Sequence, residues 1–192
     1  MLDSLFISMG VVALAEMGDK TQLLAFILAT RFRKPLPIIA GIVAATVVNH
    51  GLAGALGAWI SSFMSPQVMR WGLGLSFIGM AVWTMTPDEI EEEETRVAKR
   101  LGIFGATFVT FFLAEMGDKT QIATIALAAH FAVPFMVVVG TTLGMLLADV
   151  PAVVVGNRFA AKIPMKLVHS IAAVIFLVLG LLTLIEVDRI FR

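Results

Sequence analysis

The chain has 192 residues, no net formal charge and no cysteine; 59% of its residues are hydrophobic and only 15% are charged. A mean hydropathy of +0.95 is typical of a protein embedded in lipid and not of a soluble domain. The balanced charge gives no support for nucleic-acid binding, and the lack of cysteine excludes disulfides, thiolate metal sites and cysteine nucleophiles.

Six apolar segments follow one another along the chain, each long enough to cross, or nearly cross, about 30 Å of hydrocarbon. The first is predicted to be a retained span and not a cleaved signal, because no basic region precedes it. The segments run roughly over Leu5–Thr30, Pro37–Met64, Val68–Met85, Leu101–Ala129, Val133–Gly156 and Leu167–Ile185.

The chain contains a repeat, because the nine residues LAEMGDKTQ occur unchanged at Leu14–Gln22 and again, 99 positions later, at Leu113–Gln121. The same offset aligns Pro35 with Pro134. The sequence therefore predicts an all-α integral membrane protein built from two homologous halves of three helices each. Since an odd number of spans reverses direction, the two halves should be inverted-topology repeats. The expected units are repeat 1 (residues 1–86), an acidic cytoplasmic linker with the run EIEEEE (87–100) and repeat 2 (101–192).

Basic residues predict the orientation, because cytoplasmic loops of membrane proteins are enriched in lysine and arginine. Nine of them fall at boundaries on one side and three on the other, which places both termini outside the cytoplasm. The nine are Arg31, Arg33, Lys34, Arg96, Lys99, Arg100, Arg158, Lys162 and Lys166, and the three are Arg70, Arg189 and Arg192.

The repeated motif places charged side chains inside apolar segments, where an ionised group without a partner costs several kcal/mol. On one continuous helix Glu16, Asp19 and Lys20 would project within about 60° of one another and form a polar stripe. Two copies supply four acids and two lysines, so the excess is two negative charges, which one divalent cation or two protons would neutralise. The alternative is a purely structural role, with Glu16–Lys20 and its equivalent as internal ion pairs that lock the helices together.

Carboxylate, hydroxyl and amide oxygens form a hard ligand set, suited to Ca²⁺, Mg²⁺ or Mn²⁺. Lys20 and Lys119 would tune the charge of such a site. Gly18 and Gly117 lie within the motif, where glycine either loosens the helix and frees carbonyls or allows close packing. The predicted metal ligands are Glu16, Asp19, Glu115, Asp118, Thr21, Thr120, Gln22 and Gln121.

Two further polar residues occupy equivalent places in the halves, since His50 plus 99 is Asp149. Either could relay protons, although a lone buried histidine more often makes a hydrogen bond between helices. Enzyme motifs such as HExxH, GxSxG and a glycine-rich phosphate loop are absent, so no catalytic function is expected.

The pattern E-x-G-D-(K/R)-(T/S), met in full by residues 16–21 and 115–120, resembles the signature of the Gdt-type family of cation/proton exchangers, whose bacterial members include manganese exporters. The resemblance covers essentially the whole chain. It implies that Mn²⁺, or Ca²⁺ in some members, leaves the cytoplasm in exchange for protons. The metal would be a transported substrate and not a permanently bound cofactor, and the location would be the inner membrane of a bacterium.

The leading expectation is a secondary antiporter in which one half rocks against the other, so that a shared carboxylate site opens to each side in turn. Two alternatives stay open: an exporter of small organic cations or amino acids, and a passive divalent-cation channel.

Overall fold

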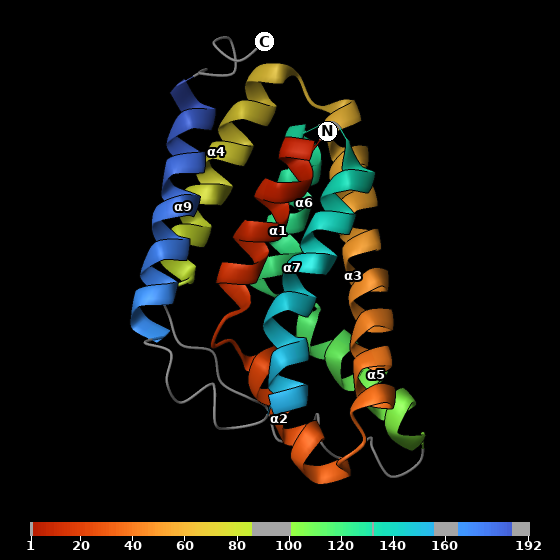
Figure 1. Cartoon of the computed structure of the whole chain (residues 1–192). Coiled ribbons are helices and arrows are strands. Elements are labelled where there is room, and N and C mark those ends of the chain that lie inside the picture. The colour runs from red at the N-terminus through yellow and green to blue at the C-terminus, as the bar shows by residue number, and fades with distance from the viewer. Residues whose placement is uncertain (1, 86–100, 132, 156–164, 186–192) are drawn as a thin grey trace.

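The computed structural model describes residues 2–85, 101–131, 133–155 and 165–185, and the predicted acidic linker lies outside them. The described residues form eight α-helices and contain no strand (Figure 1). The predicted all-α class is confirmed, but six predicted apolar segments correspond to eight helices. The helices are α1 (Leu2–Glu16), α2 (Lys20–Phe32), α3 (Pro35–Phe63), α4 (Pro66–Trp83), α5 (Gly102–Glu115), α6 (Lys119–Phe131), α7 (Pro134–Val155) and α9 (Met165–Ile185).

The repeated motif interrupts a helix in both halves. α1 ends at Glu16 and α2 begins at Lys20, and the equivalent break separates α5 from α6. The cause is Gly18, with φ +82°, and Gly117, with φ +81°, because this left-handed region is open to glycine at little cost. The prediction of a polar stripe along one continuous helix is therefore wrong: the motif places Glu16 at the end of one helix and Lys20 at the start of the next.

Helix length separates the unbroken helices from the broken ones. Among the described residues, α3 and α7 are long and apolar enough to cross a bilayer, over Pro35–Phe63 and Pro134–Val154. α1 and α2 have 15 and 13 residues, about 22 and 20 Å at about 1.5 Å per residue, so neither crosses alone. Six crossings would require each broken pair to act as one span, and they remain a prediction.

The two halves are interleaved. α1 packs along α7 and α5 packs along α3, so the first helix of each half lies against the second helix of the other half. The broken helices run in opposite directions, α1–α2 downward and α5–α6 upward in Figure 1. Close approach of α1 and α7 depends on Gly140 and Gly144, since a Cβ at either position would clash with the carbonyl oxygen of Leu5 or Met9. Consequently, each of the two buried hydrophobic clusters of the core contains residues of both halves.

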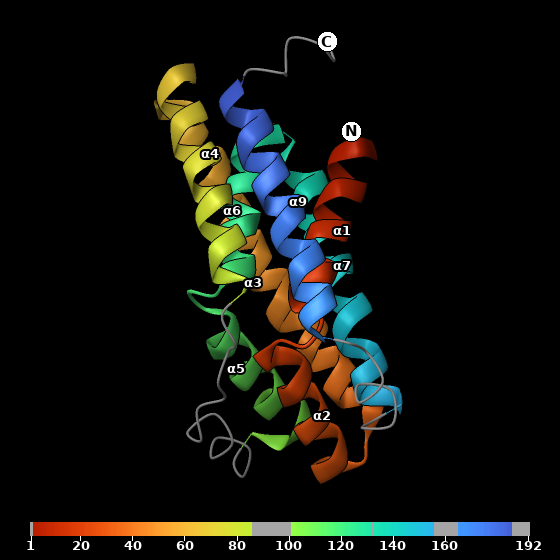
Figure 2. The same cartoon turned by 90° about the vertical axis from the view of Figure 1, so that its left-hand side faces the viewer.

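The third helices of the halves, α4 and α9, form a separate pair at one side of this core (Figure 2). Gly74 of α4 and Gly180 of α9 allow the contact, because a Cβ on either would clash with Leu184 or Ile78 of the partner helix. Among the described residues, the pair contacts the rest of the molecule mainly through α1 and α6. The α1, α2, α3, α5, α6 and α7 helices are called the six-helix core below.

Candidate metal site

Three carboxyl groups converge where the two helix breaks meet. One oxygen each of Glu16, Asp19 and Asp118 lies within 4.8 Å of the others. All three side chains are buried. Glu16 ends α1, whereas Asp19 and Asp118 immediately precede α2 and α6, where the helix dipole favours negative charge. Both motifs therefore contribute to one cluster.

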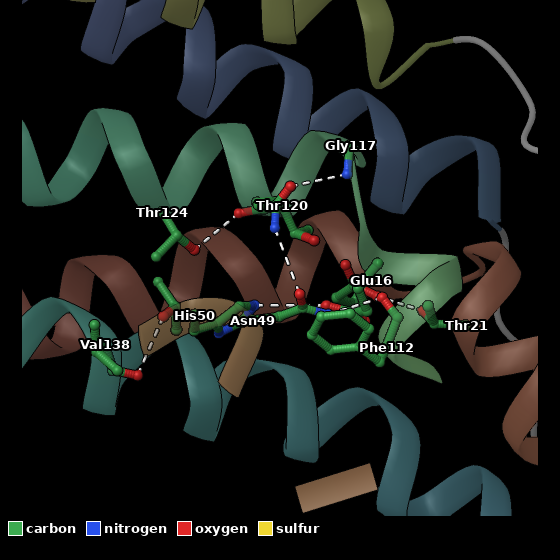
Figure 3. A network of polar contacts seen from close by, with 12 residues as sticks. Glu16, Thr21, Asn49, His50, Phe112, Gly117, Thr120, Thr124 and Val138 are labelled. Atoms are coloured by element: carbon green, nitrogen blue, oxygen red, sulfur yellow. Dashed lines mark hydrogen bonds and ion pairs between the residues drawn. The ribbon is translucent and has the colours of Figure 1, made fainter. Parts of the chain in front are cut away.

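Glu16 uses one of its two carboxylate oxygens within the protein. Thr21 Oγ1 donates a hydrogen bond of 2.5 Å to Glu16 Oε2 (Figure 3). The other oxygen, Oε1, is buried and has no hydrogen-bond partner among the described residues. A buried oxygen without a partner is costly, and a cation at this position would remove the cost.

A buried ion pair links the two motifs. Lys119 Nζ lies 2.8 Å from Asp19 Oδ1, and both side chains are 1% exposed. The alternative drawn from the sequence, ion pairs within each motif, is not what forms, because the break turns Lys119 toward the other half. Lys20, the equivalent lysine, is only partly buried.

Gln22 closes the first helix break. Its Oε1 accepts a hydrogen bond of 2.9 Å from the backbone N–H of Gly18, and its Nε2 donates one of 3.0 Å to the carbonyl oxygen of Ala148 on α7. The amide oxygen predicted to bind metal is thus engaged by backbone, and the side chain connects the break to the opposite half.

Gln121 repeats this arrangement with one difference. Its Oε1 accepts a hydrogen bond of 2.8 Å from the Gly117 N–H, but its Nε2 lies 3.5 Å from the side-chain oxygen of Asn49 on α3. Asn49 in turn donates to the carbonyl oxygen of Phe112 at 3.1 Å (Figure 3). The Nε2 group of Gln22 therefore donates to a backbone carbonyl of the opposite half, whereas that of Gln121 makes a longer contact with a side chain. The two halves are not equivalent at this position.

The remaining predicted residues lie close to the cluster but not in it. Glu115 is fully buried, and its Oε2 is 3.7 Å from His50 Nε2, an ion pair only when the imidazole is protonated. Thr120 Oγ1 is buried without a hydrogen-bond partner among the described residues, and the same is true of both Asp149 carboxylate oxygens. The structure thus brings three of the four motif acids together, while Glu115 faces a histidine, and metal binding by any of them stays a prediction.

Charge within the described part of the molecule is strongly unbalanced. Five carboxyl side chains are buried there, against a single buried lysine, Lys119. In a medium of low dielectric constant such an excess requires bound cations, whether metal ions or protons. The five are Glu16, Asp19, Glu115, Asp118 and Asp149.

Comparison with known proteins identifies the family. A family model described as "Divalent cation/proton antiporter GDT1" matches residues 4–92 and 103–190. The chain belongs to the GDT1 family. This GDT1 protein is 51% identical over 180 residues to a Vibrio cholerae protein named "Putative manganese exporter", covering 93% of this chain and 89% of the relative.

More distant GDT1 relatives occur in plants and cyanobacteria. "GDT1-like protein 3" of rice is 32% identical and aligns with 92% of this chain and 72% of its own length. A GDT1-like protein of Synechocystis is 31% identical, covering 86% and 89%. No solved structure matches. Membership confirms the resemblance seen in the motif and makes the chain a membrane transporter of cations and not an enzyme.

Proposed function

We propose that this GDT1 protein exports Mn²⁺ from the cytoplasm in exchange for protons, and that Glu16, Asp19 and Asp118 hold the ion. The observation that carries the proposal is their convergence, with oxygens within 4.8 Å of one another, in a region where buried acids outnumber buried lysines. Oxygen-only coordination suits Mn²⁺ and also Ca²⁺. The Vibrio cholerae relative, named for manganese, supports Mn²⁺ as the preferred ion.

The proposed membrane arrangement is six crossings as two inverted repeats, with both termini outside the cytoplasm of a bacterial inner membrane. The helix breaks support it, because irregular backbone at membrane depth is tolerated where it lines a polar site. Each broken pair, α1–α2 or α5–α6, then counts as one crossing and brings a helix N-terminus, at Lys20 or Lys119, to the site.

Exchange follows from competition for the same oxygens. A carboxylate cluster can be neutralised by one divalent ion or by protons, but not by both at once. Glu115, His50 and Asp149 are buried beside the cluster, and we assign them to the proton pathway, with Lys20 and Lys119 setting the charge.

Proton flux in proteoliposomes tests the proposal. Purified protein is reconstituted with a pH-sensitive dye inside, and Mn²⁺ is added outside. An antiporter should move protons out as Mn²⁺ enters, and Ca²⁺ in the same assay gives the ion preference. Mn²⁺ uptake without proton movement would instead support a channel. Flux driven by amino acids or organic cations but not by Mn²⁺ would support the exporter alternative.

A further inference from the structure

The ion pair between the two motifs breaks the symmetry of the repeat. Lys119 binds Asp19 at 2.8 Å, and the repeat relates these residues to Lys20 and Asp118. The described residues contain no such ion pair between Lys20 and Asp118, and Lys20 stays partly exposed. Two identical motifs thus adopt different electrostatic arrangements in one structure.

The packing of the third helices, α4 and α9, also differs between the two repeats. α9 lies against α1 and α4 lies against α6, but the pairs that the repeat makes equivalent, α4 with α5 and α9 with α2, scarcely touch within the described residues. Figure 2 shows α4 and α9 beside the upper part of the core, away from α2 and α5. Inside the six-helix core, by contrast, the main contacts have repeat-related counterparts: α1–α7 corresponds to α5–α3, and α2–α7 corresponds to α6–α3.

Symmetry defines a second arrangement. Because both halves have the same motif and the same order of helices, a state in which they exchange conformations is built from the same contacts. Reaching it by rocking one half against the other, as the sequence suggested, would separate α1 from α7 and α5 from α3, which are extensive interfaces. Among the described residues, moving the α4–α9 pair along an intact six-helix core disturbs mainly the smaller contacts with α1 and α6, where Phe77 and Phe176 share a buried hydrophobic cluster with the core.

Resting on the antiport function above, we propose that the α4–α9 pair and the six-helix core shift relative to each other and that the two lysines exchange roles in this shift. In the present state Lys119 neutralises Asp19. In the opposite state Lys20 neutralises Asp118 and Lys119 is released. Each lysine acts as a tethered cation that stabilises one orientation of the empty site, and an incoming metal ion must compete with it.

The structure supplies reporters for both states. The rings of Phe77 on α4 and His130 on α6 lie 6.5 Å apart, so cysteines at these positions report the present contact. Subtracting or adding 99 gives Arg31 on α2 and Phe176 on α9, which should meet only in the opposite state. The chain has no native cysteine, so a short bifunctional thiol reagent applied to membrane vesicles reads each pair separately.

Neutralising Lys119 and neutralising Lys20 should change the ratio of the two cross-links in opposite directions. Lys119→Gln weakens the present state, so the ratio of the 77–130 to the 31–176 cross-link should fall by about tenfold, or about 1.4 kcal/mol. Lys20→Gln weakens the opposite state, so the ratio should rise. A purely electrostatic role for both lysines predicts equal shifts of the same sign, and that result, or no shift in either variant, would overturn the proposal.

Two controls separate this inference from the rest. Lys119→Arg keeps the charge and should leave the ratio near that of the parent, which shows that a shift in Lys119→Gln is not caused by misfolding. Mn²⁺ binding is measured on the same preparations. Opposite cross-link shifts without Mn²⁺ binding would refute Mn²⁺ as the substrate but support the lysine exchange. Mn²⁺ binding without those shifts would support the substrate and refute the lysine exchange.

Discussion

Replacing Glu16 with glutamine removes one charge from the candidate site and keeps its shape. The Gln amide oxygen can accept the Thr21 hydrogen bond, which then turns the NH₂ group toward the position where an ion would bind. At an effective dielectric constant of about 20, a unit charge and a divalent ion about 4 Å apart attract by about 8 kcal/mol. Desolvation offsets most of this energy. We expect a net loss of about 2.7 kcal/mol, or a hundredfold weaker affinity for Mn²⁺.

Glu115→Gln is the matched control, since it makes the same change at the equivalent position of the other half. Glu115 is outside the three-carboxylate cluster and faces His50, so its replacement should weaken Mn²⁺ binding by about tenfold or less while impairing proton flux. Both affinities are measured by titration calorimetry on protein that elutes as a single species. Mn²⁺ binding by Glu16→Gln as tight as that of the parent, or an equal loss of affinity in the two variants, would contradict a metal site at the three-carboxylate cluster.

Three further predictions concern the fold. Gly117→Ala places a Cβ at φ +81°, so the thermal midpoint of the detergent-purified protein should drop by an amount equivalent to about 1–2 kcal/mol; an unchanged midpoint would mean that the helix break is not fixed. Gly144→Ala should separate α1 from α7 and cost about 1–3 kcal/mol, whereas Gly51→Ala, at a position with open space around it, should cost nothing in the same assay. A single cysteine at Ser4 should react with an impermeant thiol reagent in intact cells and one at Thr95 should not; the reverse labelling would invert the proposed orientation.

Much of the fold could be predicted because the repeat is explicit in the sequence. The 99-residue offset predicts that α1 to α3 have counterparts, and α5 to α7 begin and end within the matching segments. The acids of the cluster could be found for a similar reason: charge is so costly inside an apolar segment that Glu16, Asp19 and Asp118 stand out without any knowledge of the fold.

Other features of the site depend on tertiary contacts and could not be predicted from the spacing of residues in the sequence. Whether Gly18 breaks the helix or packs against a neighbour is decided by φ, since glycine serves both purposes. The partner of Lys119 could not be predicted. If the helix were unbroken, Glu115, four residues earlier, would be its nearest acid, but the break brings Lys119 to Asp19 instead. The unequal placement of Glu16 and Glu115 is likewise hidden, since identical motifs differ only in what the other half presents to them.

The interleaving of the halves constrains how the protein is made. The N-terminal half leaves the ribosome first, with Glu16 and Asp19 at its first helix break, but the helix that packs along α1 and the lysine that pairs with Asp19 belong to the half synthesised later. During biosynthesis the bilayer must therefore hold an acidic, incompletely packed intermediate until α6 and α7 have been inserted. A single half could complete its core only with a second copy inserted in the opposite direction, which is the arrangement expected of an ancestor before its gene was duplicated and fused.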